Sequence, residues 1–292
     1  MKRPFKQVDV FTSVPFGGNP VAVVLDAREL SESQMQRIAN WTNLSETTFV
    51  LPPTQAEADY RVRIFTPRAE LPFAGHPTLG TAHALLEAGK IAARNGRLTQ
   101  ECATGLIALT VTTADSGAVQ IAFEVPSPSF SPLSANQIDE LEQIIGAAVL
   151  RAHPPKFVNV GPTWTVVQLA DADAVLSLAP DMGRLSAFDR YTRSTGVVAF
   201  GAYAKGADAA MEVRAFAPSQ GVNEDPVCGS GNGAVAAFVR DAGLVEAFGS
   251  TYTSSQGAVV GRSGKLSITI DASGVIRVGG QSVTCIDGAI SC

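Results

Sequence analysis

The chain carries a long internal repeat, and this repeat limits the folds that it can adopt. Residues 63–67 read Arg-Ile-Phe-Thr-Pro, and residues 214–218, which lie 151 positions later, read Arg-Ala-Phe-Ala-Pro. Residues 74–77 read Ala-Gly-His-Pro, and residues 228–231, which lie 154 positions later, read Cys-Gly-Ser-Gly. The matched segments keep their order, as expected for a duplicated structural unit. The sequence therefore predicts two similarly folded domains.

Each copy has a glycine turn that opens an apolar helix. Gly75 precedes the helix expected at residues 78–86, and Gly229 precedes the helix expected at residues 233–239. The start of a helix exposes unpaired backbone N–H groups and the positive end of the helix dipole, which together suit an anion. Two such turns facing each other would hold a carboxylate-bearing small molecule, so both glycines are candidate substrate-binding residues. The alternative is that each glycine only permits a tight turn.

The remaining pattern indicates an α+β chain. Capping boxes at Ser31 and Ser134 each predict the start of a further helix. Alternating or β-branched runs predict strands at residues 7–12, 21–25, 46–51, 60–65, 105–112, 119–125, 257–261 and 265–270. Both central helices are apolar on nearly every side, which is typical of buried helices. We therefore expect two pseudosymmetric domains, each a β-barrel-like sheet wrapped around a central helix.

A proline-rich segment at residues 126–132 marks the expected domain boundary. We place the first domain at residues 1–128 and the second at residues 129–277. The tail, residues 278–292, goes beyond what the repeat requires, and we expect it to return to the first domain.

Composition excludes several classes of function. The 292 residues are 46% hydrophobic and carry a net charge of −5 with no run of Lys or Arg, which argues against nucleic acid as a partner. No apolar run approaches the roughly 18 residues of a membrane span, and no apolar signal core follows the basic N-terminus. We therefore expect a cytoplasmic protein. The four cysteines and three histidines lack metal-ligand spacing, so neither a metal nor another cofactor is expected.

Two residues of the first half are candidates for acid/base chemistry. Glu46 is the only charged residue of residues 43–50, a stretch with strand character. A carboxyl on an apolar sheet surface is desolvated, and its pKa rises toward the range that a general acid/base needs. His76 follows Gly75 directly, where the helix dipole should keep its imidazole neutral. The alternatives are a strand-edge glutamate in water and a histidine that only caps its helix.

The second half supplies Asp225, Cys228 and Ser230. The second copy has three extra residues between its proline and its glycine turn, and we expect Asp225 to lie in this insertion. An Asp-Pro pair before a helix is most often only a cap or a turn. Ser230 occupies the position of His76 in the repeat and could donate a hydrogen bond to substrate. Together with Glu46 and His76, these residues suit the movement of a proton on a small acid without metal or nucleotide.

These segments resemble the PhzF-like family of phenazine biosynthesis. The resemblance rests on residues 18–24 (Gly-Asn-Pro-Val-Ala-Val-Val), 43–47 (Asn-Leu-Ser-Glu-Thr), 65–67 with 71–80, and 224–230. The late segments 256–257, 261–262 and 278–280 fit as well. It implies the diaminopimelate epimerase-like fold, with the active site in the cleft between the two domains. It also implies cofactor-free isomerisation of a dihydro-hydroxyanthranilate, and homodimers are common in the family.

The resemblance assigns roles to individual residues. Glu46 would be the acid/base that shuttles the proton. Catalysis would also involve two further residues, His76 and Asp225, which with Ser230 would bind and orient substrate. The backbone of Gly75 and Gly229 would hold the substrate carboxylate.

One position departs from the family pattern. Residues 225–230 read Asp-Pro-Val-Cys-Gly-Ser, where the family usually has Asp-Pro-Ala-Thr-Gly-Ser. Cys228 resembles the second catalytic cysteine of diaminopimelate epimerase and proline racemase, but its counterpart in the first half is Ala74. Two-thiol racemisation is therefore not expected. A one-thiol epimerase or dehydratase that uses Cys228 remains an alternative, as does a non-catalytic ligand-binding dimer.

Overall fold

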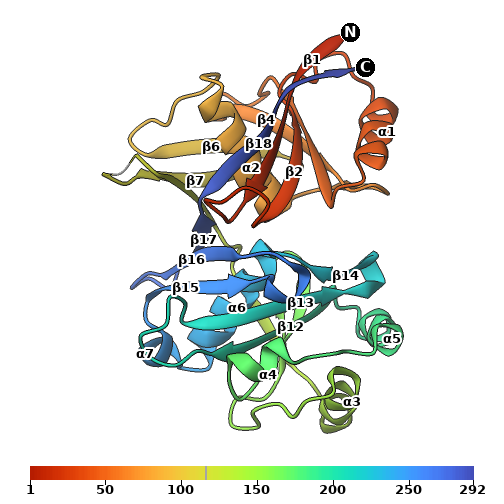
Figure 1. The fold of residues 1–292 in the computed structure, drawn as a ribbon, viewed down its shortest axis with the longest axis vertical. Coiled ribbons are helices and arrows are strands. Elements are labelled where there is room, and N and C mark those ends of the chain that lie inside the picture. The colour runs from red at the N-terminus through yellow and green to blue at the C-terminus, as the bar shows by residue number, and fades with distance from the viewer. Residues whose placement is uncertain (116) are drawn as a thin grey trace. The chain divides into compact units, whose positions relative to one another are not determined.

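The computed structural model describes residues 1–115 and 117–292, and the chain divides into two compact units. The first unit comprises Met1–Glu124 and Gly279–Cys292, and the second comprises Val125–Val278. In the first unit the C-terminal strand returns to pair with the N-terminal strand, so that both chain ends lie side by side (Figure 1). The tail thus belongs to the first unit.

The first unit is a curled sheet around one buried helix. Its strands are β1 (Lys2–Val10), β2 (Asn19–Val24), β3 (Glu46–Leu51), β4 (Tyr60–Phe65), β5 (Glu70–Leu71), β6 (Arg97–Cys102), β7 (Gly105–Thr113), β8 (Val119–Glu124) and β18 (Ser282–Ser291), and its helices are α1 (Glu32–Thr42) and α2 (Gly75–Glu87). The central helix α2 packs against β1, β2, β3, β8 and β18. Most of its side chains are buried, which explains its apolar sequence.

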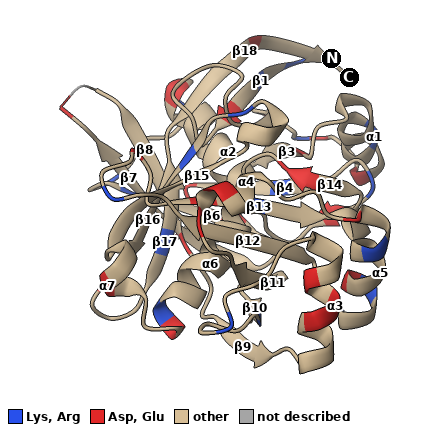
Figure 2. Cartoon of the chain, turned by 60° about the horizontal axis from the view of Figure 1, so that its bottom comes forward, with Lys and Arg blue, Asp and Glu red and all other residues tan. Residues whose placement is uncertain are grey.

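The second unit repeats this plan with more helices on its outside. Its strands are β9 (Ser129–Pro132), β10 (Lys156–Asn159), β11 (Thr163–Gln168), β12 (Gly196–Ala202), β13 (Met211–Ala217), β14 (Val222–Asp225), β15 (Thr251–Gln256), β16 (Gly264–Ile270) and the first part of β17 (Ile276–Gly280), whose last two residues belong to the first unit. Its helices are α3 (Ala135–Ile145), α4 (Ala172–Leu176), α5 (Met182–Thr192), α6 (Gly229–Asp241) and α7 (Val245–Phe248), with short 3-10 turns at Pro218–Gln220 and Ala258–Val260. The central helix is α6. Charged residues mark the outer helices α3 and α5 (Figure 2).

Strand pairing confirms the duplication. In the first unit the order β1-β2-β3-β4-β6-β7 runs antiparallel, parallel, antiparallel, parallel, antiparallel. In the second unit the order β10-β11-β12-β13-β15-β16 follows the same sequence of directions. The predicted architecture, two similar α+β units that each wrap a sheet around a central helix, is therefore confirmed.

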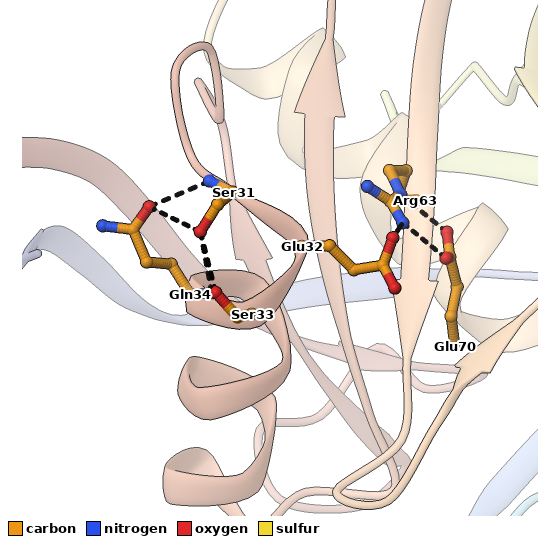
Figure 3. A network of polar contacts seen from close by, with 6 residues as sticks. All are labelled: Ser31, Glu32, Ser33, Gln34, Arg63 and Glu70. Atoms are coloured by element: carbon orange, nitrogen blue, oxygen red, sulfur yellow. Dashed lines mark hydrogen bonds and ion pairs between the residues drawn. The ribbon is translucent and has the colours of Figure 1, made fainter.

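A side-chain motif is also repeated. In the first unit the Arg63 guanidinium donates to both carboxylate oxygens of Glu70, at 2.7 and 2.6 Å (Figure 3). The same guanidinium lies over the Phe65 ring. In the second unit Arg214 bonds both oxygens of Glu224, at 2.9 and 2.8 Å, and lies over the Phe216 ring. A bidentate pair fixes both side chains in one geometry. The motif therefore links β5 to β4 in the first unit and β14 to β13 in the second.

This equivalence corrects the expected place of Asp225. Because Glu70 corresponds to Glu224, Asp225 corresponds to Leu71, and each pairs with the matching residue of the neighbouring strand, Ile64 or Ala215. The three extra residues therefore precede Glu224, in the segment that contains the turn Pro218–Gln220. The comparison of the two halves of the sequence misplaced them because this short segment has no residues that are repeated in both halves.

One strand prediction was wrong, and two polar strands were missed. Residues 257–261 form a 3-10 turn rather than a strand, and the strand of this region is β15 just before it. Its equivalent β6 was not predicted. Both strands are rich in polar residues, which obscures the alternation on which strand prediction depends. Both predicted capping boxes, at Ser31 and Ser134, are present, and Figure 3 shows the first.

Candidate functional site

The first unit brings Glu46 and His76 together. Glu46 begins β3, and His76 is the second residue of α2. Glu46 Oε2 lies 3.3 Å from His76 Nε2, and the two side chains are only 15% and 6% exposed. The carboxyl thus lies against the glycine turn, as required of a residue that acts there.

The His76 ring is held in its neutral form. Burial lowers the pKa of His76 to about 3, against the opposing effect of a hydrogen bond to the Pro20 carbonyl. Nε2 takes no part in that bond, so the ring donates to Pro20 through its other nitrogen. In a neutral imidazole the second nitrogen is then an acceptor. His76 therefore presents a lone pair to Glu46.

Gly75 is needed for close packing at the start of α2. A Cβ on Gly75 would lie 2.7 Å from the Phe123 ring of β8. The N-cap residue, Ala74, makes no side-chain hydrogen bond to the helix start. The first amide groups of α2 are consequently not capped by the preceding side chain, in contrast to those of α6.

The second unit brings Asp225, Cys228 and Ser230 together. Cys228 is the N-cap of α6, and its Sγ accepts a hydrogen bond from the Gly231 amide at 3.3 Å. Ser230 Oγ lies 3.7 Å from the same sulfur. Desolvation raises the pKa of Asp225 to about 6, although hydrogen bonds from the Cys228 thiol and the Val227 amide oppose the shift.

Cys228 is a protonated thiol in this arrangement. Burial raises its pKa well above the ordinary value, and the neighbouring Asp225 raises it further. Since the thiolate is the reactive form of cysteine, this environment suppresses rather than activates it. Cys228 donates to Asp225 and caps α6.

A buried amide network supports this turn. Gln256, 1% exposed, accepts hydrogen bonds from the Cys228 amide (3.0 Å) and from Asn232 Nδ2 (2.9 Å), and donates to the Asp225 carbonyl (2.8 Å). Ser254 in turn donates to Asn232 Oδ1 at 2.6 Å. Gly257 packs so closely that a Cβ there would lie 2.6 Å from the Pro226 carbonyl. The turn is thus fixed from several sides.

The two half-sites are not equivalent. By strand register Glu46 corresponds to Gly196, where a Cβ would lie 2.0 Å from the Phe216 carbonyl oxygen. A carboxylate side chain cannot be accommodated there. Asp225 likewise corresponds to an apolar residue, Leu71. Each unit therefore supplies one carboxyl group that the other lacks.

Sequence analysis did not find the residues that support the site. The roles of the Pro20 carbonyl, Asn232 and Gln256 were not predicted. Asn232 carried a signal, because it is a polar residue directly before the apolar run 233–239 of the central helix. Within the described residues there is no group of three or more His, Cys, Asp or Glu that could bind a metal ion. No helix in that part of the chain is long and apolar enough to cross a membrane.

Comparisons with known proteins show the family to which the chain belongs. A family model described as "Phenazine biosynthesis-like protein" matches residues 8–288. The chain is 42% identical to "Antisense-enhancing sequence 1" of Schizosaccharomyces pombe, over 98% of each chain. It is 38% identical to a trans-2,3-dihydro-3-hydroxyanthranilate isomerase of Pseudomonas fluorescens, over 87% of this chain and 86% of that one. Among solved structures, a Bacillus anthracis phenazine biosynthesis protein of the PhzF family has a TM-score of 0.87 at 25% identity, covering 100% of both chains.

Proposed function

Because the chain belongs to the phenazine biosynthesis-like protein family, whose PhzF members include named isomerases, we propose that it is a cofactor-independent isomerase. Its substrate in this proposal is a small cyclic, unsaturated carboxylic acid, and its reaction is the transfer of a proton within that molecule. The observation that carries the proposal is the close contact between the Glu46 carboxyl and the neutral His76 ring.

The contact favours a proton on Glu46 before reaction. A carboxylate oxygen and the lone pair of a neutral imidazole are both acceptors, so they attract each other only through a proton between them. Because the ring proton is directed at Pro20, this proposal assigns the proton between the two groups to the Glu46 carboxyl. Glu46 is therefore poised as a general acid whose proton is held by a neutral partner.

The proton balance of the reaction is simple. Glu46 delivers its proton to one carbon of the conjugated acid, and the carboxylate so formed removes a proton from another carbon of the same molecule. The double bonds move, the formula of the substrate does not change, and Glu46 returns to its starting state. One acid/base group suffices, in keeping with the glycine at the corresponding position of the second unit.

The remaining candidate residues bind and orient the substrate in this proposal. The uncapped amides at the start of α2 and those of Gly229 and Ser230 would hold the carboxylate, because amides at helix starts favour anions. Asp225, with a pKa of about 6, would accept a hydrogen bond from a polar substituent of the same substrate at neutral pH.

The one-thiol alternative is less well supported. A cysteine that removes a proton must first become a thiolate, and both burial and Asp225 oppose this at Cys228. A non-catalytic binding protein would have no need of Glu46 beside His76. The expected homodimer remains a prediction, which light scattering on the purified protein tests.

The test uses the purified full chain with a metal chelator and without added cofactor. The substrate supplied is trans-2,3-dihydro-3-hydroxyanthranilate, which appears in the name of the Pseudomonas fluorescens relative, and its proton NMR signals are followed. The proposal predicts loss of the substrate and formation of an isomer of the same mass. An unchanged substrate, together with epimerisation of an amino acid by the same preparation, would instead support the one-thiol alternative.

A further inference from the structure

We infer that Trp164 is a positioning residue for Ser230, and that it directs the Ser230 hydroxyl to donate its hydrogen bond to an acceptor oxygen of the substrate. This inference rests on the proposed function and extends it, because it states which chemical group the second half-site requires. Trp164 Nε1 donates a hydrogen bond to Ser230 Oγ at 3.1 Å. Trp164 itself is only 3% exposed.

The direction of this bond is fixed by the tryptophan. An indole N–H can only donate, so one lone pair of the Ser230 oxygen is always occupied by the indole. The hydroxyl proton must then point elsewhere. One neighbour within its reach is Cys228 Sγ at 3.7 Å, a weak acceptor. The thiol proton is itself directed to Asp225.

A stronger acceptor would displace the sulfur. Carboxylate and carbonyl oxygens form better hydrogen bonds with a hydroxyl than a thiol sulfur does. Since Ser230 is partly exposed, its hydroxyl can turn to such an oxygen without breaking the bond from Trp164. The half-site therefore selects for a substrate oxygen that accepts, not for a group that only donates.

The internal repeat argues that Trp164 does more than fill space. In the strand register, Trp164 pairs with Gly196, and the residue that pairs with Glu46 in the first unit is Val21. Val21 is fully buried, so an aliphatic side chain meets the packing needs of this position. The residue that follows the glycine of the turn differs as well: it is His76 in the first unit and Ser230 in the second. The indole donor of Trp164 and the hydroxyl of Ser230 thus both occur in the second unit, and the first unit has neither at the corresponding positions.

The test is a double-mutant cycle on ligand binding. The variants are Trp164→Phe, Ser230→Ala and their combination, and the probe is 3-hydroxyanthranilate measured by calorimetry. Trp41→Phe is the matched control, because Trp41 is 78% exposed on α1 and the chain contains only these two tryptophans. We expect each single variant to weaken binding about threefold to tenfold, the worth of one neutral hydrogen bond.

The coupling between the two changes decides the inference. If Trp164 acts through Ser230, the combined variant binds no worse than Ser230→Ala alone. With substrate, KM should rise while kcat changes little, since the bond is made in ground and transition states alike. Independent, multiplying losses would overturn the inference and leave Trp164 a packing residue.

A second variant separates the lost N–H from lost packing. In the Trp41→Phe background, replacement of the remaining tryptophan by benzothienylalanine keeps the size of the ring but removes the N–H. This replacement should weaken binding of the probe as much as Trp164→Phe does. If the wild type binds the probe and the replacement leaves that binding unchanged, the inference is overturned. If the wild type does not bind 3-hydroxyanthranilate at all, the proposed substrate class fails, and the inference that rests on it fails too.

Discussion

The turn that carries Asp225 and Cys228 depends on Gln256, and the substitution Gln256→Leu tests this dependence. Leucine has nearly the same volume but cannot form the three hydrogen bonds of the buried amide. Asn232 keeps a bond from its Nδ2 to the Cys228 carbonyl, at 2.9 Å. The change therefore removes the Gln256 side-chain amide as the partner of the Cys228 amide and of the Asp225 carbonyl.

The expected cost follows from those two groups. The buried Cys228 amide, left without its partner, costs about 1–3 kcal/mol, and the lost bond to the part-buried Asp225 carbonyl costs about 0.5–1.5 kcal/mol, so the loss is about 2–4 kcal/mol. For a unit of this size, 1 kcal/mol corresponds to roughly 2–4 °C in Tm, and the loss should lower Tm on the order of 10 °C. Activity should also be reduced at assay temperatures well below the new Tm, because the Asp225 carboxyl is no longer held in place.

Thermal unfolding followed by circular dichroism measures the effect. Gln220→Leu is the control, since Gln220 is an exposed residue of a short 3-10 turn and its substitution should change stability by less than about 0.5 kcal/mol. If Gln256→Leu behaves like this control, the proposed support of the turn is refuted.

Two further predictions concern the second unit. Cys228→Ser should retain activity within about threefold, because serine keeps the cap of α6 and the donor to Asp225. If Cys228 were instead a thiol base, this variant would lose nearly all activity, and steady-state turnover measures the difference. Asp189 is fully buried, and burial raises its pKa from 3.8 to about 7, so the unfolded chain releases this proton at lower pH than the folded one. The free energy of unfolding should therefore fall by a few kcal/mol, in order of magnitude, as pH rises from about 4 to 7, and Asp189→Asn should flatten this slope in urea titrations; an equally steep slope in the variant would contradict the prediction.

The sequence predicted the fold well because the repeat is recorded in residues with strong local preferences. The two glycine turns, the apolar central helices and the capping boxes at Ser31 and Ser134 each specify one local structure. The family resemblance, now confirmed, agreed with that pattern. The polar strands β6 and β15 were missed because their side chains are buried through hydrogen bonds, such as Ser254 to Asn232, rather than through apolar contact.

The candidate site was predictable as a set of residue types but not as a geometry. Glu46 and His76 are distant in sequence, and only pairing of β2 with β3 and packing against α2 bring them within 3.3 Å. The tautomer of His76 depends on a backbone carbonyl, that of Pro20, which no side-chain pattern reveals. The hydrogen bond from Trp164 to Ser230 likewise joins two separate elements.

The most direct test of the central proposal compares chemistry and binding in Glu46→Gln. Glutamine keeps the size of the side chain and can still donate to His76 Nε2, but it cannot give or take a proton. We expect turnover of trans-2,3-dihydro-3-hydroxyanthranilate to fall about 10²–10⁴-fold, as is typical for the loss of a general acid/base. The affinity for 3-hydroxyanthranilate should stay close to that of the wild type, because the backbone amides at the helix starts hold the carboxylate. Full turnover by Glu46→Gln would contradict the proposed role of Glu46 and the isomerase mechanism built on it.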